Sequence, residues 1–250
     1  MSSPLKFIAP SLLNDDVVSS WFSLKNADFL NTENAVPGLN IGYNTNATVE
    51  EINANRALLS RGINTPLSDI AYAKQIHGTG IKEVSKGDYA GDYDGLITTT
   101  IGIALAIQVA DCAAVLLCDK GKRIISAVHA GWRGAVGGIV PKAIDLMVQK
   151  GSSIENIQIF ISPCISLNKF EVGDEVAQRF PDSFVDRESF EKPHVDLGSF
   201  IRWQLSEKGI LEGNIENSTA CTFTDENEFY SYRREGDKSG RMMAIIKLNS

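Results

Sequence analysis

The sequence predicts an α+β fold with mixed β-sheets. Segments with the apolar pattern of β-strands outnumber helical segments, and they occur in runs rather than in strict alternation with helices. The sequence contains no G-x-G-x-x-G motif and no Walker loop, so nothing supports a doubly wound dinucleotide-binding domain or a P-loop domain. No internal repeat and no linker rich in Pro, Gly or Ser divides the chain. We therefore expect residues 1–250 to form a single domain.

The first part of the chain combines two short strands with one well-defined helix. Segments 5–9 and 17–24 have the composition of strands. A helix is predicted over 48–62, where Thr48 caps the first turn, Glu51 completes a capping box and Gly62 supplies the stop. The next part is rich in strands, which we expect within 69–78, 81–84, 94–99, 103–110, 113–119 and 123–130.

The second half is predicted to contain most of the helices. An amphipathic helix is expected over about 135–150, followed by Gly151. Its apolar stripe consists of Val136, Ile139, Val140, Ala143, Ile144, Met147 and Val148. One further strand is expected over 157–162, and further helices are expected over 172–180 and 197–209.

Composition and charge exclude several classes of protein. With 43% hydrophobic and 22% charged residues, the chain has the composition of a soluble globular protein. Its net charge of −7 offers no basic surface for nucleic acid or for an anionic membrane. The N-terminal sequence MSSPLKFIAPSLL lacks the long apolar region of a signal peptide. The four cysteines show no close C-x-x-C pairing, so we expect a reduced, cytoplasmic protein.

Three residues at the ends of predicted strands form a candidate metal site. His77 and His129 each end a strand and are followed by small residues, and Cys112 interrupts an apolar run. If the fold brings them together, two imidazoles and a thiolate suit zinc and leave a fourth position open. The same ligand set occurs in blue-copper centres, so ligand identity alone does not exclude copper.

Two other interpretations of these three residues stay open. In the first, both histidines are ordinary strand-end residues and Cys112 is a small buried hydrophobe. In the second, Cys112 is a nucleophile that one of the histidines activates. The spacing in the sequence does not decide between them.

Asp111 is unusual because a carboxylate within an apolar run is costly unless it is paired. Its partner could be a ligand histidine, an arginine or a substrate proton, or it could form an ordinary buried Asp–Arg bridge. Neighbouring residues of a strand point to opposite faces. If Asp111 and Cys112 both reach one site, the strand must therefore end or bulge between them.

Two groups of basic residues are candidates for binding an anion. Arg133 lies in a glycine-flanked loop with Trp132, at the start of the second predicted helix, where an anion would be held well. Alternatively, Trp132 belongs to the core and Arg133 pairs with a carboxylate. Near the C-terminus, the segment YSYRREGDKSGR contains Arg233, Arg234 and Arg241. A basic run of this kind is more often a solvated surface.

These motifs, taken in order, resemble a known family. QIHGTGI, DGLITT, ADCAAVLL, VHAGWRG, FEVGDEV and SYRREGDKSGR extend from about Asn40 to Arg241 and resemble the bacterial purine nucleoside phosphorylase family, long labelled polyphenol oxidase or laccase-domain proteins. The resemblance implies a zinc site at His77, Cys112 and His129. It also implies a four-layer α/β/β/α fold, likened to a cysteine-hydrolase domain.

Two segments depart from the family pattern. A T-R-x-G-G stretch near the N-terminus is replaced here by SLKNADF, so Lys25 would take the place of a substrate-binding arginine, as a point charge. The family's G-P-x-I-G-P-C-C-Y-E-V is replaced by SPCISLNKFEV, in which Cys164 does not match a family cysteine.

The resemblance implies a zinc-dependent enzyme that phosphorolyses adenosine, inosine, guanosine and methylthioadenosine and deaminates adenosine. Purine nucleosides and phosphate would be its partners. Asp111 and Arg133 are the expected catalytic residues, and Arg133, Arg233, Arg241 and Lys25 are expected to bind substrate or phosphate. The alternatives are a cysteine hydrolase, a copper-dependent phenol oxidase and a non-catalytic zinc-binding accessory protein. Three histidines are too few to bind the four coppers of a multicopper oxidase.

Overall fold

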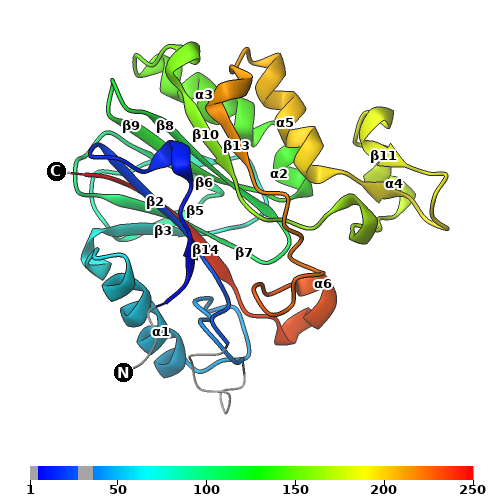
Figure 1. Ribbon diagram of the computed structural model, residues 1–250, viewed down its shortest axis with the longest axis horizontal. Helices are drawn as coiled ribbons and strands as arrows, with labels where there is room; N and C mark the ends of the chain where they lie inside the picture. The colour runs from blue at the N-terminus through cyan, green and yellow to red at the C-terminus, as the bar shows by residue number, and fades with distance from the viewer. Residues whose placement is uncertain (1–4, 28–35, 250) are drawn as a thin grey trace.

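Two large β-sheets lie face to face and carry helices on their outer sides (Figure 1). The computed structural model describes residues 5–27 and 36–249, and in these residues each of the two sheets has six strands. Most of the strands and helices expected from the sequence are present. The α+β class and the layered α/β/β/α arrangement are therefore confirmed.

The first sheet contains the strands nearest both ends of the described chain. In spatial order it consists of β1 (Phe7–Ile8), β2 (Val18–Ser23), β14 (Met242–Leu248), β7 (Ala104–Val109), β3 (Ile70–Lys74) and β5 (Tyr89–Asp92). β3 pairs in parallel with both β7 and β5, and the other pairings are antiparallel. The apolar segment of β14 was not among the predicted strands, although it lies in the middle of this sheet.

The second sheet is formed by the middle of the chain. In spatial order it consists of β13 (Ile215–Asn217), β10 (Gln158–Ile161), β8 (Ala113–Asp119), β9 (Ile124–Ala130), β6 (Gly95–Thr98) and β4 (Ile81–Glu83). The two edge strands pair in parallel with their neighbours, and the inner strands pair antiparallel. A separate small sheet joins β11 (Val185–Asp186) to β12 (His194–Val195).

The predicted helices lie where they were expected, but their boundaries differ from the predictions. α1 (Val49–Gly62) has the expected capping box between Thr48 and Glu51, but the left-handed residue after it is Asn64 rather than Gly62. The second predicted helix is two helices, α2 (Trp132–Val136) and α3 (Ile139–Gln149), separated at Gly138, whose φ is +78°. The remaining α-helices are α4 (Asp174–Ala177), shorter than predicted, α5 (Leu197–Glu207), and α6 (Tyr232–Glu235), which was not predicted.

The buried side chains alternate between the layers as strand geometry requires. On β7, Leu105 and Ile107 point into the core between the sheets, whereas Ala104 and Ala106 face the core that includes Leu59 of α1. On β8, Ala114 and Leu116 face the first sheet, and the intervening residues pack under α3 and α5. Both sheets are therefore covered on both faces, which explains their nearly continuous apolar sequences.

The chain crosses from one sheet to the other at 110–112, between β7 and β8. This crossing explains why an aspartate and a cysteine interrupt the apolar run. No helix among residues 5–27 and 36–249 is both long and apolar enough to span a membrane.

Candidate metal centre and pocket

The fold brings together the three residues proposed as metal ligands. One potential ligand atom from each of His77, Cys112 and His129 lies within 4.8 Å of the others. The histidine rings meet edge to face, with their centroids 4.8 Å apart. His129 lies on β9, Cys112 on the crossing between the sheets, and His77 in the loop after β3. The three side chains therefore converge from both sheets.

Asp111 and Cys112 occupy a break between strands, as predicted. β7 ends at Val109 and β8 begins at Ala113. Asp111 has a φ of +90°, a conformation that is unfavourable for residues other than glycine. Its carbonyl oxygen accepts a hydrogen bond from the Ile165 N–H.

The side chain of Asp111 is paired, but not with a ligand histidine. Its Oδ1 accepts a hydrogen bond from the Thr222 hydroxyl at 2.8 Å, and its Oδ2 accepts one from the backbone N–H of Arg233 at 2.6 Å. The carboxylate thus ties the crossing between the sheets to α6 and the segment before it. The expectation that Asp111 partners a ligand histidine is corrected, and so is that of an ordinary Asp–Arg side-chain bridge.

The carboxylate that orients His129 is Asp94, which sequence reasoning missed. His129 Nδ1 lies 2.8 Å from Asp94 Oδ1. Because an ionised carboxylate only accepts, Nδ1 carries the proton and Nε2 is left to bind a metal. Burial alone would raise the pKa of Asp94, but hydrogen bonds from His129 and from the backbone of Gly78 and Ile76 lower it overall.

Asp94 also shapes the loop that carries His77. The backbone N–H groups of Ile76, His77 and Gly78 all donate to its carboxylate. His77 is held in a left-handed conformation, with a φ of +60°. A single fully buried carboxylate therefore positions two of the three candidate ligands.

The cluster favours the thiolate form of Cys112. Burial would raise the pKa of this thiol, but the charge of His129 and hydrogen bonds from both histidines lower it to about 6. A thiolate is the form that binds metals and the form that acts as a nucleophile.

Gly131, directly after β9, leaves space for the cluster. A Cβ atom at this position would lie 2.8 Å from Cys112 Sγ and 3.3 Å from His77 Cδ2. Any larger residue would displace the ligands, which is a physical reason for glycine in the HAGWRG motif.

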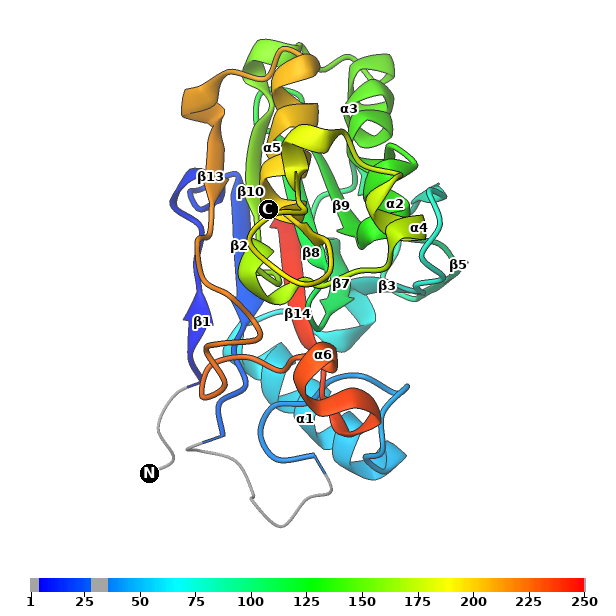
Figure 2. The ribbon, with the colours of Figure 1, turned by 90° about the vertical axis from the view of Figure 1, so that its right-hand side faces the viewer.

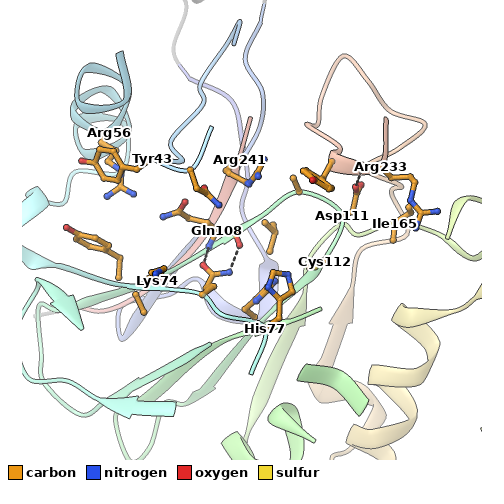
Figure 3. Close-up of a pocket in the computed structure, with 18 of the residues that line it drawn as sticks. Tyr43, Arg56, Lys74, His77, Gln108, Asp111, Cys112, Ile165, Arg233 and Arg241 are labelled. Atoms are coloured by element: carbon orange, nitrogen blue, oxygen red, sulfur yellow. Dashed lines mark hydrogen bonds between the residues drawn. The ribbon is translucent and has the colours of Figure 1, made fainter. Parts of the chain in front are cut away.

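The cluster lies on a cavity of about 620 Å³. Its lining comes from both sheets, α1 and the C-terminal segment. Figure 3 labels lining residues of the first sheet, of α1, of the crossing between the sheets and of the C-terminal segment. Two lining residues from neighbouring strands are linked, because the Gln75 amide donates to the Gln108 carbonyl and accepts from the Gln108 backbone N–H. The volume suits a small organic molecule.

Of the predicted substrate-binding residues, Arg233 and Arg241 line this cavity. Arg233 Nη1 donates to the Glu171 carbonyl, and Arg241 Nη1 donates to the carbonyls of Ser239 and Gly240. Arg234 instead donates to three backbone carbonyls of the segment 222–229.

Arg133 and Lys25 are not among the residues that line the cavity. Arg133 is exposed, and its guanidinium lies over the Trp132 ring at 4.4 Å. Lys25 Nζ donates to the Glu226 carbonyl and lies 4.0 Å from Glu235. Neither residue lines the described cavity, and their expected roles toward the open metal position and the substrate stay predictions. The glycine-flanked turn of α2 directs Arg133 to solvent.

A second residue that sequence reasoning missed is Arg56 of α1. Only 7% of its surface is exposed, and it lines the cavity. Its helical position next to Asn55, within the buried stripe of α1, was a signal in the sequence. Arg56 contacts Tyr43 and Tyr72, which lie outside α1, so no pattern within the helix indicated these contacts.

Comparison with known proteins identifies the family. Residues 26–249 match the model of a family described as multi-copper polyphenol oxidoreductase laccase. The chain belongs to this family. It is 36% identical over 200 residues to a purine nucleoside phosphorylase of Deinococcus radiodurans, covering 78% of this chain and 76% of that protein.

Two other similar proteins extend the comparison. The adenosine deaminase RL5 of an unknown prokaryotic organism is 30% identical over 231 residues, covering 85% of this chain and 88% of its own. The crystal structure of the hypothetical protein YfiH of Bacillus licheniformis has a TM-score of 0.86 at 29% identity and covers 93% of both chains. The fold of this family member thus agrees with a solved relative over nearly its whole length.

Proposed function

We propose that this protein is a zinc-dependent enzyme of purine nucleosides that phosphorolyses adenosine, inosine, guanosine and methylthioadenosine and deaminates adenosine. The observation that carries the proposal is the convergence of His77, Cys112 and His129 on a cavity large enough for a nucleoside. The names of two similar proteins, a purine nucleoside phosphorylase and an adenosine deaminase, support the substrate class.

The donor set fits zinc. Two imidazoles and a thiolate match the three-ligand pattern of catalytic zinc sites. Histidine ligands in such sites donate their other ring N–H to a carboxylate or carbonyl, as His129 does through Nδ1 to Asp94. A zinc ion held here would supply Lewis acidity toward the substrate. The chain's own residues would bind and orient the nucleoside.

Copper stays the alternative metal. A blue-copper centre adds a weak axial ligand, which is methionine, glutamine or a backbone oxygen, to two histidines and a cysteine. No methionine lines the described cavity, but Gln75 and Gln108 do, so metal analysis has to separate zinc from copper. The four coppers of a multicopper oxidase exceed what the three histidines of the chain can bind. A multicopper laccase mechanism therefore does not fit this chain, whereas a single-copper phenol oxidase stays the alternative.

Asp111 stays a candidate for proton handling, because it lines the cavity beside Cys112. In phosphorolysis, phosphate forms a bond to C1′ of the ribose, the bond from C1′ to the purine nitrogen breaks, and the purine takes up a proton. In deamination, water adds at C6 and ammonia leaves. Both reactions need a group that moves a proton near the substrate.

The test is metal analysis combined with a chromatographic screen of nucleosides. We expect about one zinc per chain. With phosphate, free purine and ribose 1-phosphate should appear, and without phosphate, adenosine should give inosine and ammonia. Cys112→Ser should lose zinc and both activities together. Zinc-loaded wild-type protein that converts none of the four nucleosides would contradict the proposal.

A cysteine hydrolase is the second candidate, because one observation favours it. Asp94, His129 and Cys112 follow one another as carboxylate, imidazole and thiol, which is the order of a cysteine triad. In that case Cys112→Ala would keep its zinc, and an alkylating reagent would label Cys112 of the wild type whether or not zinc is added. Labelling that zinc prevents would instead support the metal site.

A further inference from the structure

One wall of the cavity contains a buried cation without an anionic partner. Arg56 is 7% exposed, and its Nε donates to the Ile41 carbonyl at 3.0 Å. Its Nη2 is buried without any hydrogen-bond partner. No carboxylate forms an ion pair with it among residues 5–27 and 36–249. A buried charge with unused donors is costly, and a ligand of opposite charge removes that cost.

The Nε of Arg56 is used on the Ile41 carbonyl, so the groups left for a ligand are its terminal nitrogens, of which Nη2 is buried and has no hydrogen-bond partner. The guanidinium carbon lies 4.2 Å from the centroid of the Tyr43 ring and 4.9 Å from that of Tyr72. These rings stabilise the cation and fix its plane, but they do not satisfy its N–H donors. A guanidinium held in this way is prepared for a two-point contact with an oxyanion.

The charges that line the cavity point to an anionic ligand. The chain has a net charge of −7, yet four lysines and arginines line the cavity: Arg56, Lys74, Arg233 and Arg241. One carboxylate, that of Asp111, lines the described cavity with them, and its oxygens already accept hydrogen bonds from Thr222 and Arg233. A positive cavity in an acidic protein concentrates anions.

Arg56 is better placed than the other arginines to hold such an anion. Like Arg56, Arg233 and Arg241 each use one nitrogen on backbone carbonyls, but Arg233 is exposed and Arg241 is half-buried, whereas Arg56 is buried. Arg133 lies outside the cavity lining. Figure 3 shows Arg56 and Tyr43 on the side of the cavity away from Asp111 and Arg233, with Lys74 below them. Lys74 is exposed and adds a second positive charge to that wall.

We propose that Arg56, packed against Tyr43 and Tyr72, is the phosphate-binding subsite of this cavity. The inference rests on the proposed function, which needs a phosphate, and it assigns to Arg56 the role that the sequence suggested for Arg133. The phosphate is either free orthophosphate or the 5′-phosphate of a nucleoside monophosphate. Both present the same oxygens to the guanidinium.

The test is equilibrium dialysis with radioactive orthophosphate and, separately, with adenosine 5′-monophosphate. Loss of a hydrogen bond to a charged group should weaken binding about tenfold or more in Arg56→Met. Arg56→Lys should also bind more weakly, because lysine cannot make the two-point contact. The matched control is Arg61→Met, which changes an exposed arginine of the same helix and should bind like the wild type.

The two phosphate sources give different patterns. Weaker binding of both ligands in Arg56→Met identifies orthophosphate as a ligand, and weaker binding of the monophosphate alone identifies the nucleotide. Either pattern supports the subsite. Binding of both ligands that is unchanged relative to Arg61→Met would overturn it.

A measurement on the wild type covers the case in which Arg56→Met does not fold. In protein with ¹⁵N-labelled arginine, the Nε–H signal that is absent from Arg56→Lys should shift on adding phosphate and not on adding chloride. No shift would overturn the subsite. If phosphate binds at Arg56 but no nucleoside is cleaved, the proposed function is refuted and the subsite is not. If Arg56→Met phosphorolyses nucleosides with an unchanged KM for phosphate, the subsite is refuted and the proposed function is not.

Discussion

At the scale of single residues, the candidate site depends on two buried carboxylates with different tasks. Asp94 accepts hydrogen bonds from His129 and from three consecutive backbone N–H groups of the loop that carries His77. Asp111 accepts hydrogen bonds from Thr222 and Arg233 and holds the crossing between the sheets. The first positions the candidate metal ligands, whereas the second fixes a strained backbone.

Replacing Asp94 tests the first of these tasks. Asp94→Asn should weaken zinc binding by roughly 10–100-fold, because the partner that orients a ligand histidine loses its charge. The amide N–H₂ group would also face backbone donors, which should lower the free energy of unfolding by about 1–3 kcal/mol. Competition with a chromophoric chelator and urea unfolding measure these effects. Asp92→Asn, an exposed change two residues earlier, should leave zinc affinity unchanged, and equal affinity in both variants would refute the role of Asp94.

At the scale of elements, the register between β8 and β9 places the cluster. Ala113 pairs with Ala130 and Ala114 pairs with His129. Cys112 therefore lies opposite Gly131, at the ends of two antiparallel strands. A side chain at position 131 would occupy the space that the thiol and the His77 ring now fill.

Gly131→Ala tests this close approach. The added Cβ would lie 2.8 Å from Cys112 Sγ, so we expect zinc content to fall to less than about a tenth of the wild-type value, in line with the loss of ligand geometry, while the circular dichroism spectrum stays native. Gly213→Ala is the control, because a Cβ there meets no atom within 4 Å. Full zinc content in Gly131→Ala would show that the ligands adjust and that the approach is not limiting.

At the scale of the whole molecule, the apolar layer between the sheets holds the two halves of the site in place. Leu116 of β8 is fully buried in this layer, as are Leu105 of β7 and Phe160 of β10. Because His77 follows a strand of the first sheet and His129 belongs to the second, the distance between the ligands depends on the packing of this layer.

Leu116→Ala should therefore lower the free energy of unfolding by about 2–5 kcal/mol through cavity formation. Leu211→Ala, at a side chain that is 55% exposed, should change it by less than about 0.5 kcal/mol. Urea unfolding monitored by fluorescence gives both values. A cost for Leu116→Ala as small as that for Leu211→Ala would mean that the layer is not tightly packed.

The amino-acid sequence by itself determined the fold class, most strands, the capping box at Thr48 and Glu51, and the identity of the three candidate ligands. These features depend on local patterns or on motifs, such as HAGWRG, that can be read along the chain. Even so, β14 was missed in the centre of a sheet, and one predicted helix proved to be two because Gly138 is left-handed.

Only the tertiary structure decided which side chains serve the site. Asp94 reaches His129 across β6 and β9, and Arg56 meets Tyr72 across α1 and β3. Each contact joins two separate elements, so no pattern within one helix or one strand indicates it. Conversely, Arg133 and Lys25 have chemistry that suits an anion, but neither of them lines the described cavity. Residue type determines the chemistry of a side chain, whereas packing between separate elements determines which site that side chain lines.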